Sequence, residues 1–141
     1  MMRGHELSKL LGVPVSTLHY YEKKGLIQPK RGENQYREYS AQDTKIMKYI
    51  LILKEAGFSL AEISEVMHRY FRQPHSADCQ AEAQIFFHAK IHELQQKIEQ
   101  YQTIITILED LPVMLGEEPL TKIQEKNDVL VDTFFNQKGW K

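Results

Sequence analysis

Apolar residues recur at helical spacing near the start of the chain. Leu7, Leu10 and Leu11 fall on one helical face, and Gly12 then interrupts the pattern. Glycine readily takes the left-handed conformation that a tight turn between two helices needs. A second short helix is predicted from about residue 14 to residue 24. The pattern therefore predicts a helix-turn-helix outline.

The segment from residue 26 to residue 40 has turn residues in its middle and alternating aromatic residues at its end. It predicts a small β-hairpin, or wing, beside the two helices. Further helices are predicted at about 41–56 and 60–70, because Ser40 and Ser59 each precede an acidic residue by three positions, as in a capping box. The apolar inner faces of these helices are predicted to contain Ile46, Tyr49, Ile50, Leu53, Ile63, Val66 and Met67.

The longest helical pattern runs from about Ala77 to Leu111 and ends at Pro112. Its apolar residues alternate spacings of four and three, as in the seam of a coiled coil. One copy of the helix would leave this stripe in water, so we expect a second copy to cover it in a homodimer. This dimerisation seam comprises Phe87, Ile91, Leu94, Ile98, Tyr101, Ile105 and Leu108.

The predicted fold class is mainly α, with a winged helix-turn-helix head and a long coiled-coil helix behind it. The predicted domains are a DNA-binding head at 1–72, a dimerisation helix at 77–111 and a C-terminal tail at 112–141. The tail is a possible effector-binding or dimer-shielding segment, since aromatic residues near a chain end are seldom left in water. The aromatic candidates for either role are Phe134, Phe135 and Trp140.

Composition places the chain among ordinary soluble proteins, with 42% apolar and 26% charged residues. No apolar stretch reaches the ~18 residues that cross a bilayer. The N-terminus lacks the apolar core of a secretory signal, and a single cysteine excludes an intramolecular disulfide framework. We therefore expect a cytoplasmic location and no membrane partner.

Charge is divided unevenly along the chain. Residues 1–70 contain 11 Lys and Arg against 8 Asp and Glu, a balance of +3, whereas residues 71–141 contain 7 against 11, a balance of −4. This asymmetry favours a head that binds a polyanion and a tail that stays away from it.

The second predicted helix has an outward face that is polar, aromatic and basic, as a DNA recognition helix requires. An ordinary solvated helix face is the alternative for this helix alone. The wing adds cations and phenol hydroxyls that can meet phosphates, although Tyr36 or Tyr39 could instead pack the wing on the head. The candidate contacts with double-stranded DNA are Ser16, Thr17, His19, Tyr20, Lys23, Lys24, Lys30, Arg31, Tyr36, Arg37 and Tyr39.

Three blocks in this order resemble the signature blocks of the MerR family of bacterial transcription regulators. They are residues 17–27 (TLHYYEKKGLI), 34–40 (NQYREYS) and 57–63 (GFSLAEI), and the resemblance extends over about residues 3–111. It implies that Tyr20 and Arg37 contact the DNA backbone, and that the long helix pairs antiparallel with its copy. It also implies RNA polymerase as a partner, and the distortion of promoters with an overlong spacer in response to an effector.

Two positions depart from the family pattern. His19 stands where Arg is usual, and Gln35 stands where Gly is usual. An imidazole in place of a permanent cation weakens phosphate attraction at position 19 or moves it toward base reading. Gln35 suggests a different geometry of the wing turn, which affects the pose of Arg37.

Metal binding and catalysis find little support in the sequence. Metal-sensing members of the family use further cysteines beyond the long helix, whereas Cys79 has only His75 nearby, so we expect no metal site and no cofactor. His88 and His92 are neighbours on one helical face without further ligands. No nucleotide-binding motif and no nucleophile with partners is present, so an enzyme is not expected. The remaining alternative is a coiled-coil adaptor that binds proteins and not DNA.

Overall fold

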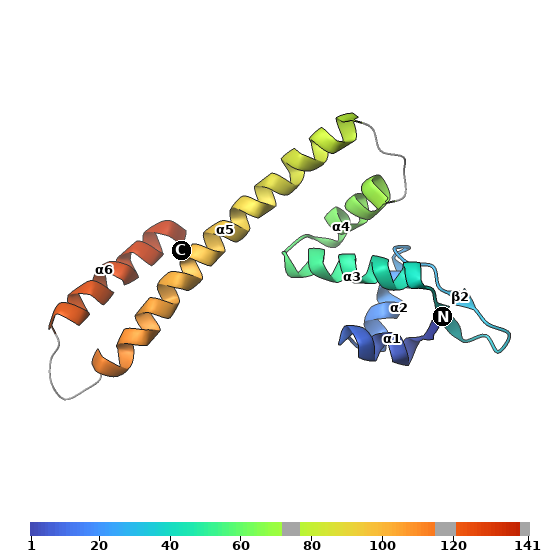
Figure 1. Ribbon diagram of the computed structural model, residues 1–141, viewed down its shortest axis with the longest axis horizontal. Coiled ribbons are helices and arrows are strands. Elements are labelled where there is room, and N and C mark those ends of the chain that lie inside the picture. Colours follow the sequence, from blue (N-terminus) through green and yellow to red (C-terminus); the bar gives the residue numbers. More distant parts are fainter. Residues whose placement is uncertain (72–76, 115–120, 139–141) are drawn as a thin grey trace. The chain divides into compact units, whose positions relative to one another are not determined.

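The computed structural model describes residues 1–71, 77–114 and 121–138, and it divides the chain into two compact units, Met1–Gln80 and Ala81–Lys141 (Figure 1). We call the first unit the head and describe each unit separately. No helix of the described ranges combines the length and the hydropathy needed to cross a bilayer.

The head begins with the predicted helix-turn-helix. Helix α1 (Gly4–Leu11) ends at Gly12, which has a φ of 67° and so takes the left-handed conformation expected of it. The Ser8 hydroxyl donates a hydrogen bond to the backbone carbonyl of Val13 and ties the turn to α1. Helix α2 (Val15–Lys23) follows directly and buries Leu18 and Tyr21.

The wing is part of a three-stranded sheet rather than an isolated hairpin. Strands β2 (Lys30–Arg31) and β3 (Arg37–Tyr39) form the predicted antiparallel pair. Strand β1 (Met2–Arg3) adds to the other side of β3, so the strand order is β1-β3-β2. Because β1 has two residues, it shows no alternation that a sequence pattern could reveal. Pairing with β3 anchors the wing to the chain segment that leads into α1.

Gln35 lies in the wing turn with a φ of 67°, in the left-handed region that L residues other than Gly rarely adopt. Its backbone N–H donates to the Gly32 carbonyl at 2.9 Å, and the Gly32 N–H donates to the Tyr36 carbonyl at 3.0 Å. The turn therefore demands a glycine-like backbone at position 35, although the residue is glutamine.

We expect Gln35→Gly to raise the free energy of unfolding by about 0.5–1 kcal/mol, since relief of the left-handed strain outweighs the entropy that glycine adds to the unfolded chain. Urea unfolding followed by circular dichroism measures the change. Gln42→Gly, at an exposed position of helix α3 (Ala41–Glu55), is the matched control and should lose stability. A Gln35→Gly protein less stable than wild type would contradict the strain at this turn.

Three helical segments complete the head: α3, helix α4 (Leu60–Val66) and the π-helix η1 (Met67–Phe71). Both predicted capping boxes are present, because Ser40 and Asp43 exchange hydrogen bonds at the start of α3, as do Ser59 and Glu62 at the start of α4. The α-helix predicted to run to residue 70 changes to π geometry after Val66.

The head has one apolar core, to which most of its elements contribute. Tyr49 was predicted for the inner face of α3, but its side chain is 42% exposed, and Met47 is buried in its place beside Ile50. Both Tyr49 and Met47 fit a helical repeat of apolar residues, so the pattern alone does not separate them, and the larger aromatic side chain was predicted to be buried. The buried apolar residues are Leu7, Leu18, Tyr21, Leu26, Ile27, Tyr39, Met47, Ile50, Phe58, Ile63, Val66 and Met67.

The second unit contains most of the long helix α5 (Ala77–Met114) and a further helix, α6 (Thr121–Lys138). Helix α5 does not end at Pro112 as predicted but includes it within the last turn, where the missing proline N–H removes only the hydrogen bond to the carbonyl four residues earlier. The tail, for which no structure was predicted, forms α6. Lys126 of α6 pairs with Asp110 of α5 at 3.3 Å, and Asn127 is buried, so the two helices pack side by side (Figure 1).

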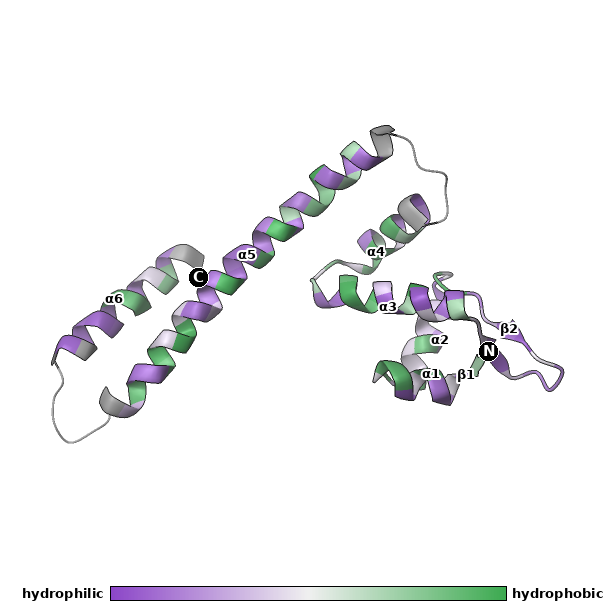
Figure 2. Cartoon of the chain, viewed as in Figure 1, coloured by the Kyte–Doolittle hydropathy of each residue, from purple (hydrophilic) through white to green (hydrophobic). Residues whose placement is uncertain are grey.

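The dimerisation seam is largely exposed in one copy of the chain. Ile98 is 66% exposed, Tyr101 is 62% exposed, and Ile91, Ile105 and Leu108 are also exposed. Figure 2 shows hydrophobic residues alternating with hydrophilic ones along α5. Helix α6 therefore does not cover the seam.

Candidate nucleic-acid interface

Helix α2 presents the outward face that the sequence predicted. With Leu18 and Tyr21 buried, the side chains of Ser16, Tyr20 and Lys23 are exposed on the other side. Lys24, just after the helix, is exposed too. The ammonium nitrogen of Lys24 lies 5.6 Å from the centre of the Tyr20 ring, which orients the phenol by a cation–π contact. The exposed face is therefore basic, aromatic and partly preorganised.

Two of the predicted contacts on α2 are less accessible. Thr17 and His19 are half-buried. Thr17 lies one position before the fully buried Leu18, and His19 faces the wing. Their backbone positions place them at the edges of the exposed face rather than at its centre.

In the wing, Lys30, Arg31 and Tyr36 are exposed as predicted. Arg31 donates from Nη1 to the Gln35 carbonyl at 3.0 Å, which braces the turn. The guanidinium carbon of Arg3, from β1, lies 4.8 Å from the centre of the Tyr36 ring. The cations at the base of the wing are therefore held in place by neighbouring groups.

Arg37 occupies a position that the sequence pattern did not foresee. Its Nε donates to Glu22 Oε2 at 2.5 Å, and the exposed fractions of the two side chains are 29% and 24%. The ion pair joins β3 of the wing to α2. Arg37 therefore ties the wing to the helix that carries the exposed basic and aromatic face.

The structure corrects the prediction that Tyr39 contacts DNA. Its side chain is 1% exposed and forms part of the head core, so no duplex can reach it. The reason lies in strand alternation: Tyr39 and Arg37 share one face of β3, and that face turns inward against α1 and α3. The alternative weighed for Tyr39, packing of the wing on the head, is the observed one.

We expect Tyr39→Phe to leave DNA affinity unchanged and the free energy of unfolding at neutral pH within about 1 kcal/mol of wild type, because the buried hydroxyl has no hydrogen-bond partner among the described residues. Burial, and then the nearby Glu22 carboxylate, raise the pKa of Tyr39. The folded state thus favours the neutral phenol, and its contribution to stability is lost as the pH rises above about 10.

The phenylalanine variant should therefore lose less stability between pH 9 and pH 11, as measured by urea unfolding. A fall in the DNA affinity of Tyr39→Phe with an unchanged fold would restore a contact role for this residue. Tyr20→Phe removes an exposed hydroxyl from α2, and its DNA affinity is measured for comparison with that of Tyr39→Phe.

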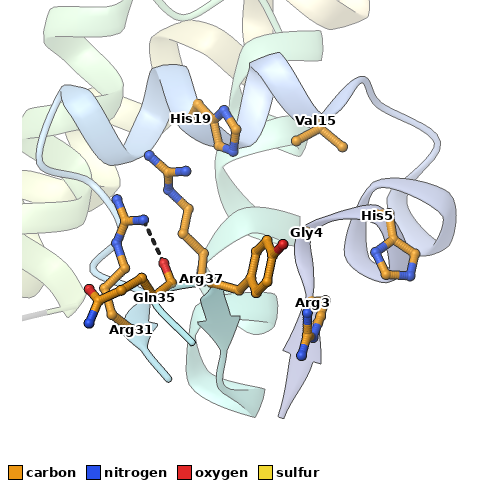
Figure 3. A pocket seen from close by; sticks show the side chains of 9 residues that line it. Arg3, Gly4, His5, Val15, His19, Arg31, Gln35 and Arg37 are labelled. Carbon is orange, nitrogen blue, oxygen red and sulfur yellow. Dashed lines mark hydrogen bonds between the residues drawn. The ribbon is translucent and has the colours of Figure 1, made fainter. Parts of the chain in front are cut away.

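A cleft of about 440 Å³ opens between the start of α1, the wing-facing side of α2 and the base of the wing (Figure 3). Figure 3 shows His19 reaching down from α2 toward the side chain of Arg37, which rises from β3. Arg3 and His5 line the cleft and were not predicted as site residues, because they lie in a two-residue strand and at a helix start without a basic run. The lining residues are Arg3, Gly4, His5, Val15, His19, Arg31, Gln35, Tyr36 and Arg37.

The candidate effector residues are only partly described. The rings of Phe134 and Phe135 pack edge to face with centres 5.8 Å apart, and Phe135 is 44% exposed. Trp140 and His75 lie outside the described residues, and the structure does not describe the side chain of Cys79. Within the described ranges, no three His, Cys, Asp or Glu side chains converge as a metal site would require.

The comparisons with known proteins agree with the head and the long helix. The family described as MerR HTH family regulatory protein matches residues 2–70, and that described as MerR, DNA binding matches residues 45–111. The HTH-type transcriptional regulator HmrR of Rhizobium leguminosarum bv. viciae is 35% identical over 75% of this chain and 80% of its own length. The mercuric resistance operon regulatory protein of Bacillus cereus is 37% identical over 75% and 79%.

Two solved structures share the fold. One is HiNmlR, a MerR family regulator lacking the sensor domain, bound to promoter DNA, with a TM-score of 0.67, 21% identity and coverage of 77% of this chain and 80% of that one. The other is a MerR family regulator from Bacillus cereus, with a TM-score of 0.63, 22% identity and coverage of 97% and 98%. The relatives are regulators and not enzymes. The chain therefore belongs to the MerR family of DNA-binding transcription regulators.

Proposed function

We propose that the protein acts as a homodimer in which two copies of α5 pair antiparallel through the dimerisation seam. The observation that carries this proposal is the exposed apolar stripe from Ile91 to Leu108, which α6 leaves uncovered. Burial of such side chains stabilises an interface by roughly 25 cal/mol for each Å² of apolar surface removed from water. A second copy of the same helix supplies a surface of matching periodicity.

The spacing of the seam suits an antiparallel pairing centred at Ile98. In such a pairing Ile91 lies opposite Ile105, and Phe87 and Leu94 lie within one residue of the positions opposite Leu108 and Tyr101, so that each seam residue has an apolar neighbour on the other copy. Ile98 meets its own copy at the twofold axis. The two heads then lie at opposite ends of the paired helices, as recognition of two half-sites in a duplex requires.

On DNA, we propose that the exposed face of α2 reads bases in the major groove and that the wing contacts the flanking backbone. Ser16, Tyr20 and Lys23 are the exposed side chains of α2 best placed to reach base edges and phosphates. By family resemblance, the dimer would distort a promoter with an overlong spacer in response to an effector, so that RNA polymerase can use it.

Selection of bound sequences from random duplex DNA tests the dimeric reading, because a homodimer should recover inverted half-sites at a fixed separation. In vitro transcription then tests the spacer mechanism, with promoters that differ only by deletion of one or two spacer base pairs. The regulator should stimulate the long-spacer promoter and lose that effect on the shortened ones. Recovery of single, unpaired half-sites would contradict the homodimer, and equal stimulation of all spacers would contradict the distortion mechanism.

The adaptor alternative accounts for the seam but not for the basic cleft or the exposed face of α2. Absence of salt-dependent binding to duplex DNA would support the adaptor instead.

A further inference from the structure

The cleft beside the wing is cationic on several sides. Three of its nine lining residues are Arg, from β1, β2 and β3, two more are His, from α1 and α2, and none is Asp or Glu. A concave surface lined with one sign of charge focuses the potential and favours an anion. Gly4 and His5 belong to the first turn of α1, whose start is capped by the Glu6 carboxylate, which accepts a hydrogen bond from the Arg3 backbone N–H at 3.2 Å.

The three arginines of the cleft differ in what they already contact. Arg37 is committed to Glu22 through its Nε. Arg31 uses one Nη to hold the Gln35 carbonyl. Arg3 lies over the Tyr36 ring, and among the described residues its guanidinium makes no hydrogen bond or ion pair.

The Arg3 guanidinium is therefore held in position while its N–H groups stay available to bind an anion. A planar guanidinium held against an aromatic face can present two parallel N–H groups to a phosphate with less loss of side-chain freedom than an unsupported one. Arg31, across the cleft, keeps its other Nη and its Nε for the same anion. The two residues come from β1 and β2, the outer strands on either side of β3.

We propose that this cleft seats one backbone phosphate of the bound DNA on Arg3 and Arg31, with Tyr36 holding Arg3 in position. The proposal rests on the DNA-binding function above and adds Arg3, which lies outside the recognition helix and the wing, to the wing residues Arg31 and Tyr36. The contact carries no base information, since phosphates are the same at every step. It sets the register of the head on the duplex.

The test is Arg3→Gln, compared with Lys9→Gln, which removes the same charge from an exposed position of α1 outside the cleft. Affinity for a specific and an unrelated duplex is measured at several salt concentrations by fluorescence anisotropy. Loss of one phosphate contact in each head should lower the slope of log affinity against log salt by about 0.9 per head, or about 1.8 for a dimer. Affinity at ~0.15 M salt should fall by about 10-fold for both duplexes.

Arg31→Gln is the second variant, from the opposite side of the cleft, and circular dichroism verifies the fold of each protein. It should reproduce the change in slope, whereas Lys9→Gln should keep the wild-type slope. Equal slopes for Arg3→Gln, Arg31→Gln and Lys9→Gln would overturn the phosphate site while leaving DNA binding intact. Failure of the wild-type protein to bind any duplex would instead refute the proposed function.

Inorganic phosphate separates the DNA backbone from a soluble anion as the occupant. Titration of the wild-type protein with phosphate, followed by amide chemical shifts, should show no saturation below the millimolar range. Saturation at micromolar phosphate, abolished by Arg3→Gln, would overturn the assignment to DNA and identify the cleft as a site for a small anionic effector.

Discussion

Replacement of Ile98 by Asp is expected to dissociate the dimer and to abolish tight binding to a full operator. Ile98 is 66% exposed in one copy and lies at the proposed twofold axis, so the substitution places two carboxylates opposite each other in an apolar seam. Burial of unpaired charge there costs ~3 kcal/mol or more, which weakens dimerisation by at least about 100-fold. The monomer binds the operator through one head alone, so it loses the gain in affinity that comes from binding two half-sites together.

Gln96→Asp is the matched control, because Gln96 is an exposed residue of the same helix about 160° around the axis from Ile98. Sedimentation velocity gives the mass of each variant, and fluorescence anisotropy gives its affinity for the selected operator. The control should remain dimeric and bind normally. An Ile98→Asp protein that stayed dimeric, or a monomer that bound the full operator as tightly as wild type, would rule out the seam as the interface.

The helical parts of the fold were predictable from the sequence because their signals are local. Apolar periodicity places α1, α2, α3 and α5, and the capping boxes at Ser40 and Ser59 mark two helix starts that the structure confirms. Such signals depend on residues three or four positions apart. They do not reveal which of two apolar residues close in the sequence is buried, as the exposed Tyr49 and the buried Met47 show.

The wing and the cleft depend on contacts between residues distant in the sequence, and these could not be predicted. Strand β1 pairs with β3 across more than thirty residues, and only this pairing brings Arg3 beside Tyr36. The inward side of β3, which buries Tyr39, follows from how the sheet packs on α1 and α3. The family resemblance singled out Arg37, but not its partner Glu22, which lies fifteen residues earlier on α2.

That ion pair leads to the second large expected effect. We expect Arg37→Ala and Glu22→Ala each to weaken DNA binding by about 10-fold, because either change detaches the wing from α2 and the wing must then be ordered when DNA binds. For Glu22→Ala, the direction of the change in DNA affinity separates two roles of Arg37, which are positioning of the wing and direct contact with a phosphate. Loss of a carboxylate beside DNA would strengthen binding if simple electrostatics decided the outcome, whereas loss of wing positioning weakens it.

The double variant gives the decisive comparison. If Arg37 and Glu22 act only through their ion pair, the double variant Arg37→Ala/Glu22→Ala should bind DNA as weakly as the weaker single variant. Independent roles would instead multiply the two losses of affinity. The coupling should amount to about 1.4 kcal/mol, the equivalent of one 10-fold loss of affinity. Affinities from fluorescence anisotropy at fixed salt provide the cycle, and urea unfolding of the free protein reports the same coupling without DNA. Tighter DNA binding by Glu22→Ala would show that Glu22 restrains Arg37 from a phosphate, and Arg37 would then be a direct ligand of the backbone.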